Sequence, residues 1–303
     1  MKFFPLLILL LASSALASQI KISMDNDLFS SNNDQDYTAS SSIVYITDNF
    51  QLKSEKLELG LVMFTPNNIQ SSQIQLNDRP YSSLIYTSYT KSENKINKIT
   101  SHSFSIGILG LHLPGKIQNF IHKNIGSPKV NGWKHQISNK GELTGLYSFI
   151  NTFSYRPLKY QKYININYGY GASLGYFTQL NTQVNFRIGY FKSFFSESGL
   201  NNGNIASENT VPIGKKFRDY YAYFGLQPKL SIYNSFLQGQ FRNSPHTISS
   251  KKLKNFIIEA WIGTHISLTK KLYLDIVYKY QTKETKIAKR DFNWGNFSIN
   301  YLF

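Results

Sequence analysis

The sequence predicts an all-β fold: a transmembrane antiparallel β-barrel of about twelve strands with a short helix in an extracellular loop. Apolar and polar residues alternate with a period of two along most of the chain. Aromatic residues form 15% of the 303 residues while mean hydropathy is only −0.30, a balance that suits a lipid-facing band around a polar interior. The last segment places Phe297, Ile299, Tyr301 and Phe303 on one face and ends on the aromatic ring.

The N-terminus reads as a secretory signal peptide over residues 1–17, with the outer-membrane β-barrel over residues 18–303. Lys2 provides the positive start, Phe3–Leu11 the apolar run, and Ala15–Ala17 the small-x-small cleavage site. The apolar run is too short to cross a bilayer, although a membrane anchor is the alternative. The sequence has no cysteine, so disulfides do not contribute.

The strand pattern recurs in successive segments. In the first, Ile20 and Ile22 share one face while Lys21 and Asp25 share the other. The predicted strands are Gln19–Phe29, Tyr37–Thr47, Lys56–Phe64, Pro80–Tyr89, Ile99–Leu113, Leu143–Tyr155, Tyr163–Phe177, Thr182–Phe194, Lys216–Ile232, Asn255–Leu268, Lys271–Lys283 and Arg290–Phe303. If the N-terminus is periplasmic, strand parity places the long polar loop Glu197–Lys215 on the periplasmic side, where turns are usually short.

One stretch, Pro114–Gly126, follows helical rather than strand periodicity. Ile117, Ile121 and Ile125 recur every fourth residue, and Gln118 and His122 share a neighbouring stripe. Pro114 suits the first helical position, and Gly126 can end the helix in a left-handed conformation. We expect this helix to lie at the barrel mouth, where its isoleucine stripe would partly plug the opening.

The net charge of +16 indicates an anionic partner. Nucleic acid is disfavoured, because the chain carries an export signal and has no basic cluster on a helix. A phosphate-bearing lipid surface fits better, and plain surface lysines that aid solubility are the alternative.

The opening hairpin carries an oxygen-rich rim. Acidic residues number only 17, yet several fall close together around the first predicted turn. Hard cations such as Ca²⁺ prefer carboxylate, amide and hydroxyl oxygens, so Asn26, Asp27 and Thr38 are the preferred metal ligands. Parity points Asp27 inward, and Thr38 points inward too if Tyr37 faces lipid. The alternative is a solvated turn whose Asp and Asn side chains cap backbone groups.

His122 is the one of six histidines that falls on a predicted helix with a polar neighbour one turn back. A neutral imidazole is a suitable general base near pH 7. The alternative is an exposed histidine on a loop helix. No Ser-His-Asp set can be assembled from spacing, so a hydrolase would use a His-activated water. Arg79 could bind a phosphate through its guanidinium fork, or could pair locally with Asp78 at a proline-defined turn.

Together these motifs resemble the outer-membrane lipid A 3′-O-deacylase (LpxR) family. Asn26-Asp27 resembles the family's Asn-Asp pair, Asp36-Tyr37-Thr38 its Asp-Tyr-Thr, and Asp78-Arg79-Pro80-Tyr81 a recurrent tetrad. The segment Gln118–His122, followed by Gly132, Trp133 and Gln136, resembles its helical loop. Departures include Ser40 in place of a usual glycine, Ser82-Ser83-Leu84 after the tetrad, and Pro128 where some members carry a glutamate that orients the histidine.

The resemblance implies a Ca²⁺-dependent hydrolase that removes an ester-linked acyl chain from the lipid A of lipopolysaccharide. It implies His122, Asn26, Asp27 and Thr38 as catalytic residues, the last three also as metal ligands, and Arg79, Lys123 and Gln118 as substrate-binding residues. The implied partners are the outer membrane, its outer-leaflet lipopolysaccharide and the barrel-assembly machinery. An outer-membrane phospholipase, or a non-enzymatic small porin or adhesive barrel, remains the alternative.

Overall fold

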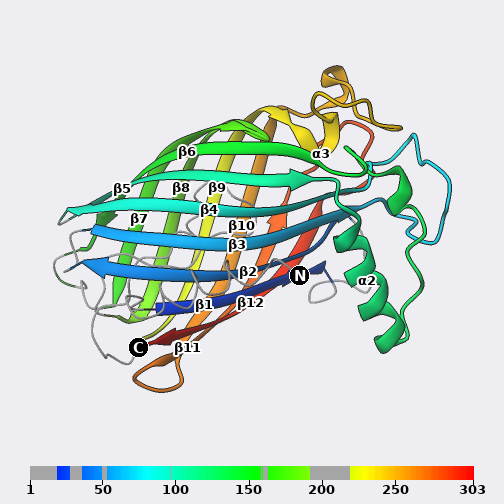
Figure 1. The fold of residues 1–303 in the computed structure, drawn as a ribbon. Helices are drawn as coiled ribbons and strands as arrows, with labels where there is room; N and C mark the ends of the chain where they lie inside the picture. Colours follow the sequence, from blue (N-terminus) through cyan, green and yellow to red (C-terminus); the bar gives the residue numbers. More distant parts are fainter. Residues whose placement is uncertain are drawn as a thin grey trace.

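The computed structural model describes residues 19–27, 36–49, 53–95, 97–157, 159, 163–191 and 219–303. The predicted signal peptide and the whole of the loop Glu197–Lys215 lie outside the described residues. Within them, twelve antiparallel strands close into a barrel in which each strand pairs with its neighbours in sequence and β1 pairs with β12 (Figure 1). This confirms the predicted fold class.

The elements follow one another in simple order. They are β1 (Gln19–Asn26), β2 (Asp36–Asn49), β3 (Lys53–Thr65), β4 (Ser82–Lys95), β5 (Lys98–Leu109), α2 (His112–Ile125), η2 (Trp133–His135), β6 (Glu142–Tyr155), β7 (Ile164–Gly175), β8 (Phe177–Tyr190), β9 (Tyr220–Asn234), α3 (Ser235–Gln238), η4 (Ser250–Lys252), β10 (Phe256–Ser267), β11 (Leu272–Gln281) and β12 (Phe292–Leu302). Gln19 at the start of β1 pairs with Leu302 at the end of β12, so both described ends lie at the barrel end opposite α2 and α3, where Figure 1 marks the C-terminus. Asp219 and Tyr190 lie at that same end, so the loop between β8 and β9 joins the strand ends that parity predicted.

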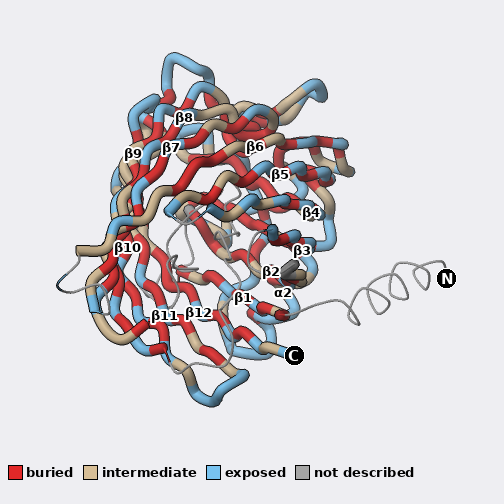
Figure 2. The backbone as a smooth tube through the Cα atoms, turned by 90° about the vertical axis from the view of Figure 1, so that its left-hand side faces the viewer, coloured by how far each residue is buried: buried red, intermediate tan, exposed pale blue. Residues whose placement is uncertain are grey.

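The alternation in sequence becomes alternation in burial. Around the wall, buried and exposed residues succeed each other along each strand (Figure 2). On β12, Phe297, Ile299 and Tyr301 face outward and are exposed, while Ser298 and Asn300 face inward and are fully buried. Strands with this pattern place apolar side chains toward lipid and polar side chains toward the lumen. Among the described residues, no helix has the length and apolarity needed to cross a membrane.

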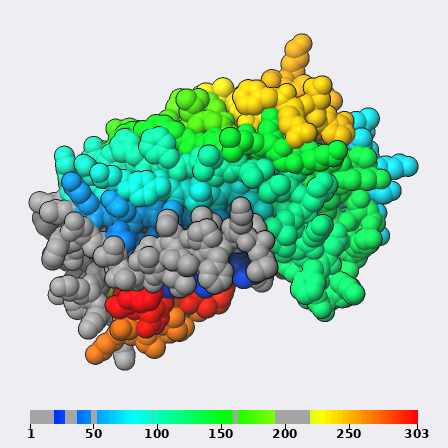
Figure 3. Space-filling view, in the orientation of Figure 1, coloured from blue at the N-terminus to red at the C-terminus, as the bar shows by residue number. Residues whose placement is uncertain are grey.

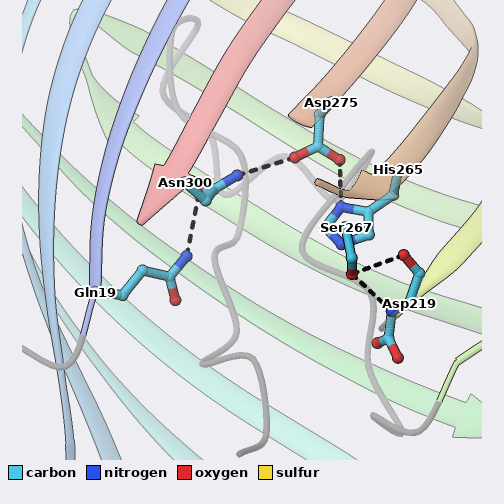
Figure 4. Close-up of polar contacts among 6 residues, drawn as sticks. All are labelled: Gln19, Asp219, His265, Ser267, Asp275 and Asn300. Atoms are coloured by element: carbon cyan, nitrogen blue, oxygen red, sulfur yellow. Dashed lines mark hydrogen bonds and ion pairs between the residues drawn. The ribbon is translucent and has the colours of Figure 1, made fainter. Parts of the chain in front are cut away.

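At the barrel end that holds Gln19 and the C-terminus, the lumen is filled by a connected polar network (Figure 4). Asp275 accepts hydrogen bonds from His265 Nδ1 at 2.7 Å and from Asn300 Nδ2 at 3.0 Å. Asn300 Oδ1 in turn accepts from Gln19 Nε2 at 3.1 Å. Gln19, Asp275 and Asn300 are fully buried, so this part of the described interior is packed and disfavours an open pore.

Several predicted boundaries differ from those of the structure: the fourth strand spans Ser82–Lys95 rather than Pro80–Tyr89, and the eighth begins at Phe177 rather than Thr182. Two further differences have local reasons. The fifth strand ends at Leu109 rather than Leu113, because Gly110 adopts a positive φ of 80° and its N–H donates to Ser83 O at 2.8 Å. The helix then begins at His112 rather than Pro114. Pro114 is tolerated there because the first turn of a helix leaves its N–H groups without intrahelical acceptors.

Candidate functional site

The rim of the β1–β2 hairpin brings the predicted oxygen ligands together. Asn26 ends β1 and pairs with Ala39 of β2, one residue after Thr38. Asp27 and Thr38 are both buried to 2% exposure. Thr38 Oγ1 lies 2.7 Å from Thr65 Oγ1, a hydroxyl pair that ties β2 to the end of β3. Carboxylate, amide and hydroxyl oxygens therefore occur on adjacent positions of one rim.

A β-bulge places Tyr37 inside the barrel. The register between β2 and β3 shifts between Tyr37 and Ala39, which changes the alternation at the end of the strand. Tyr37 consequently packs against Trp294, with ring centroids 4.8 Å apart, and its hydroxyl donates to Asp25 Oδ2 at 2.6 Å. The expectation that Tyr37 could face lipid is wrong, because simple parity does not account for the inserted residue.

Helix α2 packs with its polar stripe inward. Its buried residues include Gln118 and His122, while Ile121 and Ile125 are 46% and 57% exposed. The expectation that the isoleucine stripe plugs the mouth is therefore wrong. The helix instead lies at the end of the wall against β3 and η2, and it leaves its apolar flank uncovered (Figure 1).

The polar stripe is held by the chain that returns from the helix. Trp133 Nε1 donates to Gln118 Oε1 at 2.8 Å, and both side chains are buried. Asn119 exchanges two hydrogen bonds with the backbone of Val130, at 2.8 and 3.0 Å. A Cβ on Gly115 would lie 2.6 Å from the Trp133 ring, so glycine is needed for this close approach.

A small apolar cluster attaches this unit to the barrel. Met63 of β3 packs with Tyr81, Val130 and Trp133, and the Tyr81 and Trp133 rings lie 5.1 Å apart. Met63 is two residues from Thr65, the hydroxyl partner of Thr38. The helix that carries His122 is therefore anchored on the same part of the wall that carries the oxygen-rich rim.

His122 is buried and oriented by a backbone carbonyl. Its Nδ1 lies 2.6 Å from Pro128 O, and because a carbonyl only accepts, Nδ1 must be the donor. In the neutral imidazole the basic lone pair then lies on Nε2. The loop that presents Pro128 is set by Gly126, whose φ of 75° ends the helix, and Ser127 N donates to His122 O at 2.9 Å.

Arg79 is buried beside an acidic partner from a distant loop. Its guanidinium stacks 4.2 Å from the Phe64 ring centroid, and Nη1 lies 3.6 Å from Glu284 Oε2. Nε and Nη2 have no hydrogen-bond partner among the described residues. Asp78 instead accepts hydrogen bonds from the Arg79 backbone N–H and from Asn67. The predicted local pairing of Asp78 with Arg79 therefore involves the backbone of Arg79 and not its guanidinium.

A basic groove of 710 Å³ runs along the other flank of α2. Lys116, Lys123 and Lys129 line it together with Phe120 and Trp133. Lys123 is exposed, whereas Gln118 is buried and bound to Trp133. The two predicted substrate-binding residues thus lie on different faces of one helix.

The donor set is compatible with a hard cation. Across the described part of the chain, no three His, Cys, Asp or Glu side chains gather into a metal cluster. A cation at the rim would therefore depend on one carboxylate, Asp27, supplemented by the oxygens of Asn26 and Thr38. Such mixed oxygen ligands suit Ca²⁺ rather than a nitrogen- or sulfur-preferring metal.

Sequence reasoning missed the contacts made by the backbone and by distant loops. The partner of His122 is the backbone carbonyl of Pro128, which no side-chain pattern in the sequence indicates. A proline at this position even argued against an orienting partner, because its side chain has no polar group. Glu284 lies 205 positions from Arg79, and nothing in spacing connects them. The pairing of Trp133 with Gln118 could have been inferred, because an indole N–H in an apolar cluster needs an acceptor.

Comparison with known proteins gives one family. Residues 3–303 match the family described as outer membrane protein LpxR. The structure of LpxR from Salmonella typhimurium is similar, with a TM-score of 0.79, 18% identity, and coverage of 94% of this chain and 100% of that chain. The β domain of the Bordetella autotransporter BrkA has a TM-score of 0.48 and 8% identity, over 95% of this chain and 100% of that one. No curated protein matches.

Proposed function

The chain belongs to the LpxR family of outer-membrane lipid A deacylases, and on this basis we propose that it hydrolyses a 3′-linked acyl ester of lipid A through a water activated by His122. The observation that supports this most directly is the bond from His122 Nδ1 to Pro128 O. It holds the ring in the tautomer whose Nε2 can take a proton from water.

His122 acts as the general base in this proposal. Nε2 removes the proton from water as the water attacks the ester carbonyl. When the bond between the acyl carbon and the sugar oxygen breaks, the imidazolium gives the proton to the departing oxygen, which leaves as a sugar hydroxyl. The Pro128 carbonyl keeps its hydrogen bond while the ring is charged, as an acceptor must if the imidazolium is to be stabilised. A neutral carbonyl takes here the position at which a carboxylate stands in some family members.

We propose that Asn26, Asp27 and Thr38 hold Ca²⁺ at the rim. When bound, Ca²⁺ would stabilise negative charge that develops on the ester oxygen. Asp27 supplies the carboxylate, and burial at 2% exposure excludes most competing water. The bond of Thr38 to Thr65 fixes the hydroxyl so that its oxygen keeps one orientation.

The basic groove and Arg79 supply the substrate contacts. Lys116, Lys123 and Lys129 present cations to a phosphorylated glucosamine along α2. The unpartnered Nε and Nη2 of buried Arg79 are suited to an anionic or carbonyl oxygen. The exposed Ile121 and Ile125 face the acyl region of the leaflet.

The decisive experiment is His122→Asn. The asparagine amide nitrogen can replace the Nδ1 donor to Pro128, but no base remains at the Nε2 position. We expect a folded barrel whose deacylation rate falls by about 10²–10⁴-fold. The measurement is mass spectrometry of lipid A and of glycerophospholipids from cells that produce each variant.

The outcomes separate the alternatives. Loss of a 3′-linked chain in the wild type and its retention in His122→Asn support the proposal. Release of fatty acid from glycerophospholipid instead would indicate a phospholipase. Undiminished deacylation by His122→Asn would refute the role of His122. Chelation with EDTA and re-addition of Ca²⁺ or Mg²⁺ tests the metal separately.

A further inference from the structure

The rim of the β1–β2 hairpin contains a second carboxylate, Asp25, which the proposed metal site does not use. Asp25 is buried to 3% exposure and lies two residues before Asp27, on the inward face at the end of β1. Two residues along a strand span about 7 Å, so the two carboxylates are close neighbours. This end of β1 is the barrel end that carries α2, whose green surface occupies the same end of the molecule in the space-filling view (Figures 1 and 3).

Both oxygens of Asp25 accept hydrogen bonds from neighbouring strands. Oδ2 accepts from the Tyr37 hydroxyl of β2 at 2.6 Å, and Oδ1 accepts from Asn296 Nδ2 of β12. Asn296 Nδ2 also donates to Ser23 Oγ at 2.8 Å. Tyr37 and Asn296 are as deeply buried as Asp25. Asp25 thus ties β12, β1 and β2 together, and both of its oxygens are already directed to protein donors.

The β-bulge explains why the Tyr37 hydroxyl can reach Asp25. Successive residues of a regular strand face opposite sides, yet Tyr37 and Thr38 are both buried to 2% exposure. The register shift in β2 after Tyr37 turns both side chains into the barrel. The Tyr37 ring packs against Trp294 and Phe64, with centroids 4.8 and 5.5 Å away. Ring packing therefore fixes the position of the hydroxyl.

The bond between Asp25 and Tyr37 crosses the hairpin directly behind the proposed metal ligands. Asp25 is adjacent to Asn26 and two residues from Asp27, and Tyr37 is adjacent to Thr38. The proposed ligands come from different strands, so their separation depends on what joins the two strand ends. Hydrogen bonds behind the ligands of a metal site fix ligand orientation in this way.

We propose that Asp25 and Tyr37 are positioning residues that hold the three proposed Ca²⁺ ligands of the rim at a fixed separation. The inference rests on the metal site of the proposed function and extends it to two residues that do not touch the cation. Removing a hydrogen bond of this kind weakens metal affinity by about 10–100-fold. The effect of either residue should therefore appear in Ca²⁺ affinity and disappear at saturating Ca²⁺.

The experiment measures Ca²⁺ binding to the full-length protein in detergent by isothermal titration calorimetry, which needs no hydrolysis. Tyr37→Phe removes the hydroxyl and keeps the packed ring. We expect its dissociation constant for Ca²⁺ to rise about 10–100-fold. The Ca²⁺ concentration for half-maximal deacylation should rise by the same factor, while the rate at saturating Ca²⁺ stays that of the wild type. Asp25→Asn, which cannot accept from both Tyr37 and Asn296, tests the same bond if Tyr37→Phe fails to fold.

Tyr86→Phe is the matched control. The Tyr86 hydroxyl also donates to a buried carboxylate, Glu58 Oε1, at 2.6 Å. Tyr86 pairs with Gly60, which lies four residues along β3 from Phe64, the partner of Tyr37. The control bond is therefore about 13 Å further along the strand from the rim. Tyr86→Phe should bind Ca²⁺ as the wild type does, and an equal loss of affinity in this variant would contradict a specific role for Tyr37.

Asp27→Asn separates failure of the positioning role from failure of the metal site. It removes the carboxylate ligand and should abolish the Ca²⁺ binding of the wild type. If binding depends on Asp27 but is equally tight in wild type, Tyr37→Phe and Asp25→Asn, the positioning role is wrong and the metal site stands. If the wild type shows no Ca²⁺ binding that depends on Asp27, the metal site and the positioning role fall together. A lower rate at saturating Ca²⁺ with unchanged Ca²⁺ affinity would also overturn the proposal.

Discussion

The hydrogen bond between Gln118 and Trp133 is expected to hold α2, and with it His122, against the barrel. Gln118→Leu removes the acceptor of a buried indole N–H that now makes a 2.8 Å bond. An unsatisfied buried donor costs about 1–3 kcal/mol. Because the cost is confined to the contact between α2 and η2, it should raise the detached population of the helix about 5–150-fold without unfolding the barrel.

Hydrogen exchange of the amides in His112–Ile125 measures this opening directly, and lipid A turnover reports its consequence. The background variant Trp133→Phe removes the donor and supplies the control. In that background, Gln118→Leu should cost less than about 0.5 kcal/mol, because no indole N–H remains to be left unpaired. Equal protection losses in both backgrounds would refute the reasoning, as would faster exchange throughout the strands.

Three further perturbations follow from the structure. Gly132→Ala puts a Cβ 2.1 Å from the Tyr81 ring, so we expect a loss of about 1–3 kcal/mol in the local stability of the η2 segment, measured by proteolysis, with the barrel intact. Lys229→Met leaves Glu259 buried without its ion-pair partner and should destabilise the barrel by about 3–5 kcal/mol in urea, whereas Lys229→Met/Glu259→Leu should recover most of that loss. The hydrogen bond from Tyr280 lowers the pKa of the Asp291 carboxyl, so its stabilisation is present at neutral pH and is lost as pH falls through the lowered value. The difference in Tm between wild type and Asp291→Asn should therefore be positive at pH 7 and vanish in strong acid; a difference that grows in acid would contradict the assignment.

The strands could be predicted because a lipid-facing wall imposes its own pattern on the sequence. Polar side chains stay out of the hydrocarbon in only one orientation of β12. In that orientation Phe297 and Ile299 face the lipid, and Ser298 and Asn300 face the lumen. The helix was also predictable, since Gly126 and the four-residue period mark it without tertiary information. What periodicity could not give was which stripe of α2 faces the protein. In a membrane the apolar stripe need not be buried against protein.

For the candidate site, the sequence indicates which residues to consider and says less about their geometry. Asn26 and Thr38 were identified by motif and lie on adjacent positions of one rim. The side chain of Tyr37 could not be placed, because a bulge changes strand phase and leaves no distinct sequence signal. The partner of His122 could not be found from side chains, since it is a main-chain oxygen. The roles of the site residues in catalysis stay predictions that the His122→Asn experiment tests.

The uncovered apolar flank of α2 has a kinetic consequence. A helix that leaves large parts of Leu113, Phe120 and Ile121 exposed is stable only while a hydrocarbon phase receives them. Encounters with substrate then take place in two dimensions. Turnover should follow the surface mole fraction of the glycolipid rather than its bulk concentration, so dilution with inert detergent at constant substrate should slow the reaction.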